Sequence, residues 1–289
     1  MRKLLSGIAL IFFSLPALAQ DRPGTLLWEV TMAGQPYRSY LFGTFHEVTP
    51  AFFASLPVAS RKLDSASLLF VESLDTAQQS FSGHDAISGW SEQEWKALLS
   101  LEQQEVFMRF VKQSNNPGIY RYAPSILFLS LFRIYAQNFC DTTERDSNEL
   151  MDSYITRFFL RQEKPVIALD EDQAAVLSGS VNGDSAIRQG PYAAYCINFM
   201  NLMLASDDSE CRLIKDYKDL NLDYALDREL RGFDNLFTER NRRWCKTLTE
   251  AFNRNNCFVA VGFRHLFYKE GLIQQLRQKG YTVQPIPVK

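Results

Sequence analysis

The chain has 289 residues, of which 46% are hydrophobic and 13% aromatic, a composition that excludes an intrinsically disordered protein. Its 31 basic and 33 acidic residues give a net charge of −2, so there is no excess of positive charge to attract nucleic acid or an anionic membrane. A chain of this length has ample apolar surface to bury in one large domain.

The first residues have the composition of a secretory signal. Arg2 and Lys3 form a basic start, residues 4–15 are apolar, and residues 17–19 (Ala-Leu-Ala) offer a small-x-small cleavage site. The apolar stretch is too short for an ordinary membrane-spanning helix. We therefore predict a signal peptide over residues 1–19, a periplasmic or secreted bacterial protein, and no stable membrane span after cleavage. An uncleaved anchor is the alternative.

Five cysteines follow the signal, at positions that do not form a Cys-x-x-Cys pair, so neither a zinc knuckle nor a thioredoxin-type motif is indicated. In an exported protein they predict one or two disulfide bonds with one thiol left over. Spacing does not determine the pairing; the nearest pairs in sequence are Cys196 with Cys211 and Cys245 with Cys257.

The first elements are predicted to be strands. Two runs of β-forming residues, 26–32 and 37–42, flank the turn residues 33–36 (Ala-Gly-Gln-Pro) and predict a hairpin. A helix over 51–66 and an apolar strand over 67–71 should follow, and the strand ends directly at Glu72.

The middle of the chain is predicted to be mainly helical. Apolar residues recur at helical spacing from about residue 75 to 162, with a break at Asn-Pro-Gly (116–118). A short strand over 164–169 precedes an acidic cluster that begins at Asp170. Residues 179–190 have the composition of a loop, and helices resume over 191–253.

The end of the chain predicts a strand over 257–261, a helix over 272–279 that stops at Gly280, and a strand over 281–286. This order implies that the two strands pair in parallel through a right-handed crossover. We expect an α/β fold in one domain, 20–289. Its mixed sheet is formed by both ends of the chain, with a helical insertion at about 75–253 that contributes a core strand near 165–169.

One motif occurs twice. Gly43-Thr44-Phe45-His46 and Gly262-Phe263-Arg264-His265 each follow a predicted strand, and the chain has only three histidines. A strand end is a rigid mount, glycine allows close approach of the backbone, and histidine is the commonest metal ligand and acid–base group. A structural turn explains one such motif; the matched pair favours a shared site.

Three ligands and an open position for water make a hydrolytic metal site, and His46, Glu72 and His265 satisfy that count. Glu47 is the nearest candidate for a general base, but a solvated loop residue is the favoured interpretation at this position. For the two histidines the structural alternative is hydrogen bonding at a strand end, and for Glu72 it is a salt bridge. His84 has no strand before it and is expected in an exposed loop, and Cys257 has no adjacent histidine to activate it.

Taken in order, Gly43-Thr44-x-His46, the Phe-Val-Glu72 strand, the Arg240-Asn241 pair and Gly262-x-x-His265 resemble the TraB/GumN family, which includes the TIKI proteins. The segment from Val261 to Tyr281 is especially similar. The resemblance implies an α/β sheet core related to erythromycin esterase-like and ChaN-like proteins. It also implies metal-dependent peptidase chemistry.

Carried over to this sequence, the resemblance makes His46, Glu72, Arg240 and His265 the catalytic candidates, with a divalent ion (Zn, Mn or Co) on His46, Glu72 and His265. Arg240 would clamp a substrate carboxylate or an oxyanion, or else form a salt bridge with Glu239 or Asp234.

The chain departs from the family in a shorter segment after the middle strand, which leaves Asp170 without an assigned role. It also departs in the bulky Arg264, which predicts a narrower or more positive pocket.

Two hypotheses follow. The first is an exported metal-dependent hydrolase, a peptidase in particular, acting on a peptide or small-molecule substrate. The second is a non-enzymatic periplasmic binder that holds a peptide, a metal ion or haem in the same cleft. The carboxylate that accompanies the two histidines favours the first, since haem binding needs no such partner.

Overall fold

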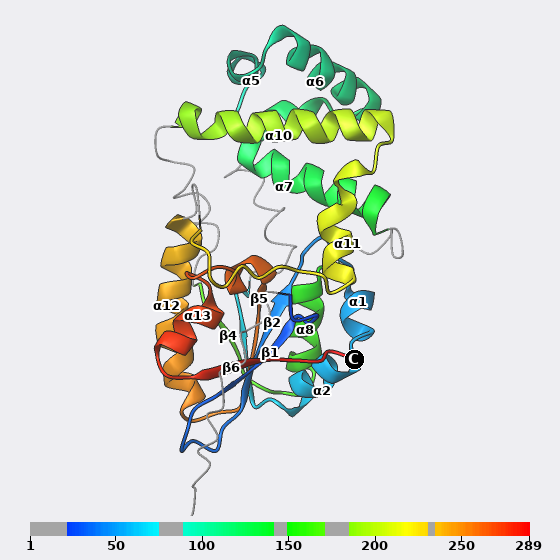
Figure 1. The fold of residues 1–289 in the computed structure, drawn as a ribbon. Coiled ribbons are helices and arrows are strands. Elements are labelled where there is room, and N and C mark those ends of the chain that lie inside the picture. Colours follow the sequence, from blue (N-terminus) through cyan, green and yellow to red (C-terminus); the bar gives the residue numbers. More distant parts are fainter. Residues whose placement is uncertain (1–21, 75–88, 142–148, 171–184, 231–234) are drawn as a thin grey trace, which may run out of the picture.

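The structure consists of a mixed β-sheet and a lobe of helices, which lies beyond one end of the strands (Figure 1). The computed structural model describes residues 22–74, 89–141, 149–170, 185–230 and 235–289. The expected α/β class and the expected mixed sheet, built from both ends of the chain, are confirmed.

The sheet has six strands in the order β4-β3-β5-β2-β1-β6. Their bounds are β1 Leu27–Thr31, β2 Ser39–Thr44, β3 Leu68–Val71, β4 Val166–Ala168, β5 Cys257–Gly262 and β6 Thr282–Ile286. The neighbours β4, β3, β5 and β2 all run parallel, whereas β1 is antiparallel to both β2 and β6. The carboxyl ends of four adjacent strands therefore lie along one edge.

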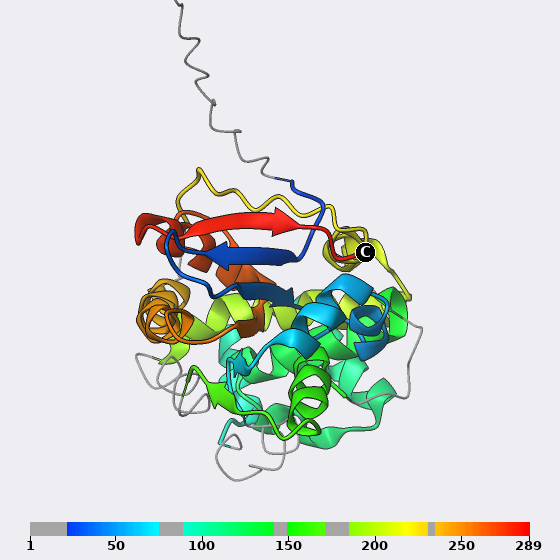
Figure 2. The same cartoon turned by 90° about the horizontal axis from the view of Figure 1, so that it is seen from below.

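The central strands are apolar because helices cover both faces of the sheet. Every residue of β2 and β3, and all of β5 except Gly262, is buried, as expected for strands with two covered faces. Figures 1 and 2 show helices α12 (Asn235–Phe252) and α13 (Leu272–Gln278) on one side of the sheet. On the other side lie α1 (Pro50–Ala54), α2 (Pro57–Ser65) and α8 (Met151–Leu160).

The lobe has a hydrophobic core of its own, centred on Trp95, Phe107, Leu131 and Met200. It consists of α5 (Glu92–Leu98), α6 (Leu101–Ser114), the 3-10 turn η1 (Pro117–Arg121), α7 (Pro124–Tyr135) and α10 (Ser185–Ala205). Ser100 divides α5 from α6 because it forms a capping box with Gln103 and so starts a new helix.

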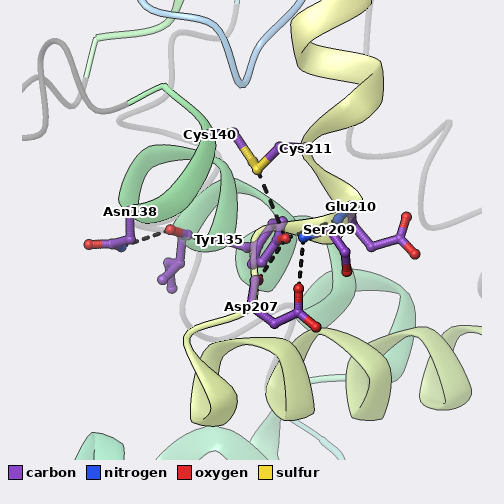
Figure 3. The surroundings of a disulfide bond; sticks show 8 residues. Tyr135, Asn138, Cys140, Asp207, Ser209, Glu210 and Cys211 are labelled. Atoms are coloured by element: carbon purple, nitrogen blue, oxygen red, sulfur yellow. Dashed lines mark hydrogen bonds between the residues drawn. A yellow bond between two sulfur atoms is a disulfide. The ribbon is translucent and has the colours of Figure 1, made fainter.

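The chain leaves the lobe through η2 (Ala136–Cys140) and re-enters the sheet domain through η4 (Ser209–Cys211) and α11 (Arg212–Lys218). A disulfide joins Cys140 to Cys211 at this junction, across 71 residues of sequence (Figure 3). Tyr135 lies beside it: its hydroxyl donates to the Asp207 carbonyl (2.9 Å) and accepts from the Glu210 amide (3.2 Å).

The nearest-neighbour cysteine pairs do not form. Cys196, Cys245 and Cys257 are free and buried, so one disulfide is present and three thiols remain. Cys211 pairs instead with the distant Cys140, because the fold brings the two ends of the lobe together where the chain crosses between the two cores.

Three other expectations are corrected. The helix expected over 51–66 is two helices, because Pro57 starts a new one after Ser55 and Leu56. Strand β6 points in the same direction as β5 but pairs with β1 at the far edge, so the two strands of the final unit are not neighbours. Helix α10 begins at Ser185, inside the range expected to be a loop, and continues through Pro191.

Within the part of the chain that the structure describes, no helix is both long and apolar enough to cross a bilayer. The predicted signal peptide and His84 fall outside the described residues, so their predictions stay predictions.

Candidate functional site

The predicted site residues follow the carboxyl ends of the four parallel strands. Thr44 at the end of β2 is paired with Gly262 at the end of β5, and Val71 at the end of β3 is paired with Ala260. On its other side Val71 is paired with Ala168 of β4. The strand ends therefore place four residues at one edge of the sheet: His46, His265, Glu72 and Asp170. In open parallel sheets, ligands bind at this edge.

The two motif glycines allow their strands to be packed closely. A Cβ added to Gly43 would lie 2.9 Å from the Cβ of Phe263, and one added to Gly262 would lie 3.0 Å from Oε1 of Glu72. Neither space admits a side chain without a shift of its neighbours.

Glu72 is held by donors on both of its oxygens. The Gly262 amide donates to Oε1 (2.6 Å) and the Arg240 guanidinium donates to Oε2 (2.6 Å). Burial alone would raise the pKa of this carboxyl, but the positive charges of Arg240 and His46, and of His265 when it is protonated in acid, lower the pKa to about 2 together with the Gly262 amide. Glu72 is therefore a buried carboxylate at neutral pH.

Arg240, on α12, bridges Glu72 and a second buried carboxylate. Its Nε donates to Oδ2 of Asp170 (2.8 Å), and its guanidinium lies over the ring of Trp244, 4.5 Å from the ring centroid. The indole of Trp244 also donates to Oδ1 of Asp170 (2.9 Å). Of the two alternative partners expected for Arg240, Glu239 pairs with Arg242 instead, and Asp234 lies outside the described residues.

The hydrogen bonds around His265 define its tautomer. The amide nitrogen of Asn241 donates to the carbonyl oxygens of His265 (3.3 Å) and Glu270 (3.0 Å). Its Oδ1 must therefore accept from Nδ1 of His265, 2.7 Å away. Nε2 is left without a proton and accepts from Nη1 of Arg240 at 3.2 Å.

Burial lowers the pKa of His265 to about 4, so the imidazole is neutral at neutral pH. Its ring is 2% exposed and contacts the rings of Phe237 and Trp244, with centroid distances of 4.7 and 4.4 Å. Glu72, Arg240, Asp170, His265 and Asn241 thus form one buried cluster, called here the closed network.

His46 lies outside the closed network, in the loop after β2. Its side chain is 42% exposed, and Nδ1 lies 2.6 Å from Oδ2 of Asp152, on α8. The charge of Asp152 raises the pKa of His46 well above its ordinary value, so the ring is a cation at neutral pH. The next residue, Glu47, is half-buried, and burial raises its carboxyl pKa.

The structure therefore brings three of the four predicted catalytic residues into direct contact. Glu72, Arg240 and His265 lie in the closed network, while the contacts of His46 go to Asp152. The charge of His46 still lowers the pKa of Glu72 and of His265, which places it within electrostatic reach of both.

Two residues that contact the predicted site residues lack a clear sequence signal. Asp170 follows a strand, as Glu72 does. It has no assigned role in the sequence analysis, because the segment after its strand is shorter than in the family. Asp152 lies in the first turn of a helix, where acidic residues are common for helix stability alone, so sequence gave no reason to select it. Arg264, expected to narrow the pocket, is exposed.

The predicted metal site consists of His46, Glu72 and His265. Among the described residues, no three His, Cys, Asp or Glu side chains are grouped so as to hold a metal ion. Both oxygens of Glu72 and Nε2 of His265 accept hydrogen bonds from Arg240 or Gly262. The guanidinium occupies the position of a cation there, so this arrangement does not fit a metal between Glu72 and His265.

A family model described as the TraB/PrgY/gumN family matches residues 26–285, which include the first five strands and all of β6 except Ile286. No curated protein and no solved structure gives a match. The match extends over nearly the whole described chain and includes both Gly-x-x-His motifs, Glu72 and the Arg240-Asn241 pair. The chain belongs to the TraB/PrgY/gumN family.

Proposed function

We propose that the chain is an exported hydrolase that cleaves amide bonds in peptides, with the carboxyl edge of the parallel strands as its active site. The observation that carries the proposal is the pairing of two unlike groups at this edge. A half-exposed, cationic imidazole stands beside a buried and fully hydrogen-bonded ion network.

In the proposed reaction His46 supplies a proton to the departing amine, because Asp152 keeps the ring protonated at neutral pH. Glu47 accepts the proton of the attacking water, since a carboxyl with a raised pKa is a better base near neutrality. The closed network holds the strand ends fixed, so Glu72, Arg240 and His265 act by positioning and by their electric field.

The divalent metal implied by the family resemblance stays a prediction, and no step of the proposed reaction uses it. Elemental analysis of the purified protein tests it directly. Metal bound in equal amounts by wild type, His46→Asn and His265→Asn would show that these histidines are not its ligands.

A peptide library digested with and without chelator, and read by mass spectrometry, tests the activity. We expect cleavage by wild type, loss of cleavage in His46→Asn, and full activity in His84→Asn, the matched control among three histidines. Tight peptide binding without cleavage would instead identify a binder. If His46→Asn and His265→Asn both cleave like wild type, the proposed site is wrong.

A further inference from the structure

Asp152 is not among the predicted site residues, but it contacts one of them, His46. Its carboxylate uses each oxygen for a different partner. Oδ1 accepts from the hydroxyl of Thr44 at 2.5 Å, and Oδ2 lies 2.6 Å from Nδ1 of His46. Oδ2 is buried and accepts no hydrogen bond of standard geometry from any described residue, so its contact with His46 is a close ion pair. The histidine ring is therefore its polar partner.

Thr44 fixes the carboxylate to the rigid part of the molecule. It is the last residue of β2, is fully buried, and is paired with Gly262 of β5. The amide of Gly262 in turn donates to Glu72. Asp152 is thus connected through two strand ends to the closed network, although it comes from a helix on the other side of the sheet.

His46 itself has no such support from secondary structure. It follows β2 by two residues, in a turn, and its side chain is 42% exposed. An exposed histidine in a turn is free to rotate about both side-chain torsions unless a partner holds it. A carboxylate on Nδ1 removes that freedom and leaves Nε2 as the nitrogen available to a ligand.

We propose that Asp152 is a positioning residue, which is anchored by Thr44 and holds Nδ1–H of His46 so that Nε2 faces the active-site edge. This deepens the proposed function, because it assigns the orientation of the acid. The alternative is that Asp152 only stabilises the first turn of α8 by its charge, and that its contact with His46 has no role.

Histidine-selective ¹⁵N labelling of the full chain gives only three ring systems, and His46→Asn identifies the one that matters. In wild type we expect a slowly exchanging, downfield Nδ1–H signal from His46, because the charged carboxylate of Asp152 lies 2.6 Å from Nδ1. The signal should be absent in Asp152→Ala and weakened in Thr44→Val. Glu47→Gln, a neighbour that does not hold Nδ1, should retain it.

Two outcomes overturn the proposal: no such signal in wild type, or an unchanged signal in Asp152→Ala. Circular dichroism of each variant shows whether it is folded, and Asp152→Asn gives a second variant of nearly equal size if Asp152→Ala unfolds. This readout does not depend on catalysis, so it remains decisive if no peptide is cleaved.

Where cleavage is found, Asp152→Asn should lower kcat by about 10- to 100-fold, the usual cost of removing the partner of a functional histidine, with little change in KM. A helix-terminal charge alone would leave kcat of the folded protein unchanged. An unchanged kcat together with a lost Nδ1–H signal would show that His46 is oriented by Asp152 but is not the acid, which separates the two proposals.

Discussion

The two Gly-x-x-His motifs begin alike and end in opposite environments. His265 is 2% exposed, neutral, and hydrogen-bonded at both ring nitrogens. His46 is 42% exposed and cationic, with a carboxylate at Nδ1. The same local sequence therefore produces one structural imidazole and one accessible imidazole.

The helices make the difference. Helix α12 lies against β5 and brings Arg240, Asn241 and Trp244 onto His265. Helix α8 brings only Asp152 to His46. The strand–glycine–histidine motif thus places the imidazole at the edge of the sheet. The helix that packs against the histidine determines whether the imidazole is charged.

The largest expected effect is at the centre of the closed network. Arg240→Met removes the cation between Glu72 and Asp170 and leaves two buried carboxylates without it. We expect a loss of about 3–5 kcal/mol in the free energy of unfolding, measured by urea denaturation.

Arg242→Met is the matched control, since Arg242 is an exposed residue of the same helix whose pair with Glu239 is exposed as well. Exposed pairs contribute about 0–1 kcal/mol. Equal losses in the two variants would show that Arg240 does not hold the closed network together.

The next effect is acid destabilisation through His265. Its pKa is about 4 in the folded chain and 6.5 when unfolded, so the unfolded state binds more protons between these values. Stability should be lost as pH falls from 6.5 to 4, by on the order of 3 kcal/mol. The lowered pKa of Glu72 extends the loss below pH 4.5, toward about 2.

Urea midpoints measured across this range test the effect. His265→Gln should show a flatter profile between pH 6.5 and 4, whereas His46→Gln should keep the wild-type slope. A wild-type protein whose stability is constant over this window would contradict a neutral, buried His265.

The smallest expected effect concerns His46, and its dependence on pH has the opposite sign to that of His265. The pKa of His46 is raised in the folded chain, so Asp152 stabilises the fold below pH 6.5, and this contribution is lost as pH rises above that value. Because the ring is 42% exposed, His46→Gln should cost less than about 1 kcal/mol at pH 7.

Differential scanning calorimetry at pH 6 and pH 9 measures this. The Tm difference between wild type and His46→Gln should shrink at pH 9. A large loss of stability at either pH would mean that His46, like His265, belongs to the structural core.

Much of the fold could be predicted from sequence because the strands are short apolar runs bounded by turn residues. The hairpin and the strands before Glu72 and Gly262 have strong local signals, and helical spacing marks the range that contains α7 and α8. The position of β6 could not be predicted, since its partner β1 lies at the other end of the chain. The Cys140–Cys211 pair is equally non-local.

The site follows the same rule. His46, Glu72 and His265 were identifiable because each follows a strand, and parallel strands bring their ends together. Arg240 was identifiable through the family resemblance. Asp152 was not, since it lies on a helix at a position that carries no periodic or motif signal. The pKa values of the two histidines depend on those partners, so sequence predicted the residues and not their charge states.

The Cys140–Cys211 bond has a consequence for how the molecule tolerates damage. It closes residues 140–211, which include α10, into a covalent ring. A protease that hydrolyses one peptide bond inside this ring leaves both fragments tied together. Nicked molecules should keep their full mass on a non-reducing gel and separate into two bands only after a reductant is added.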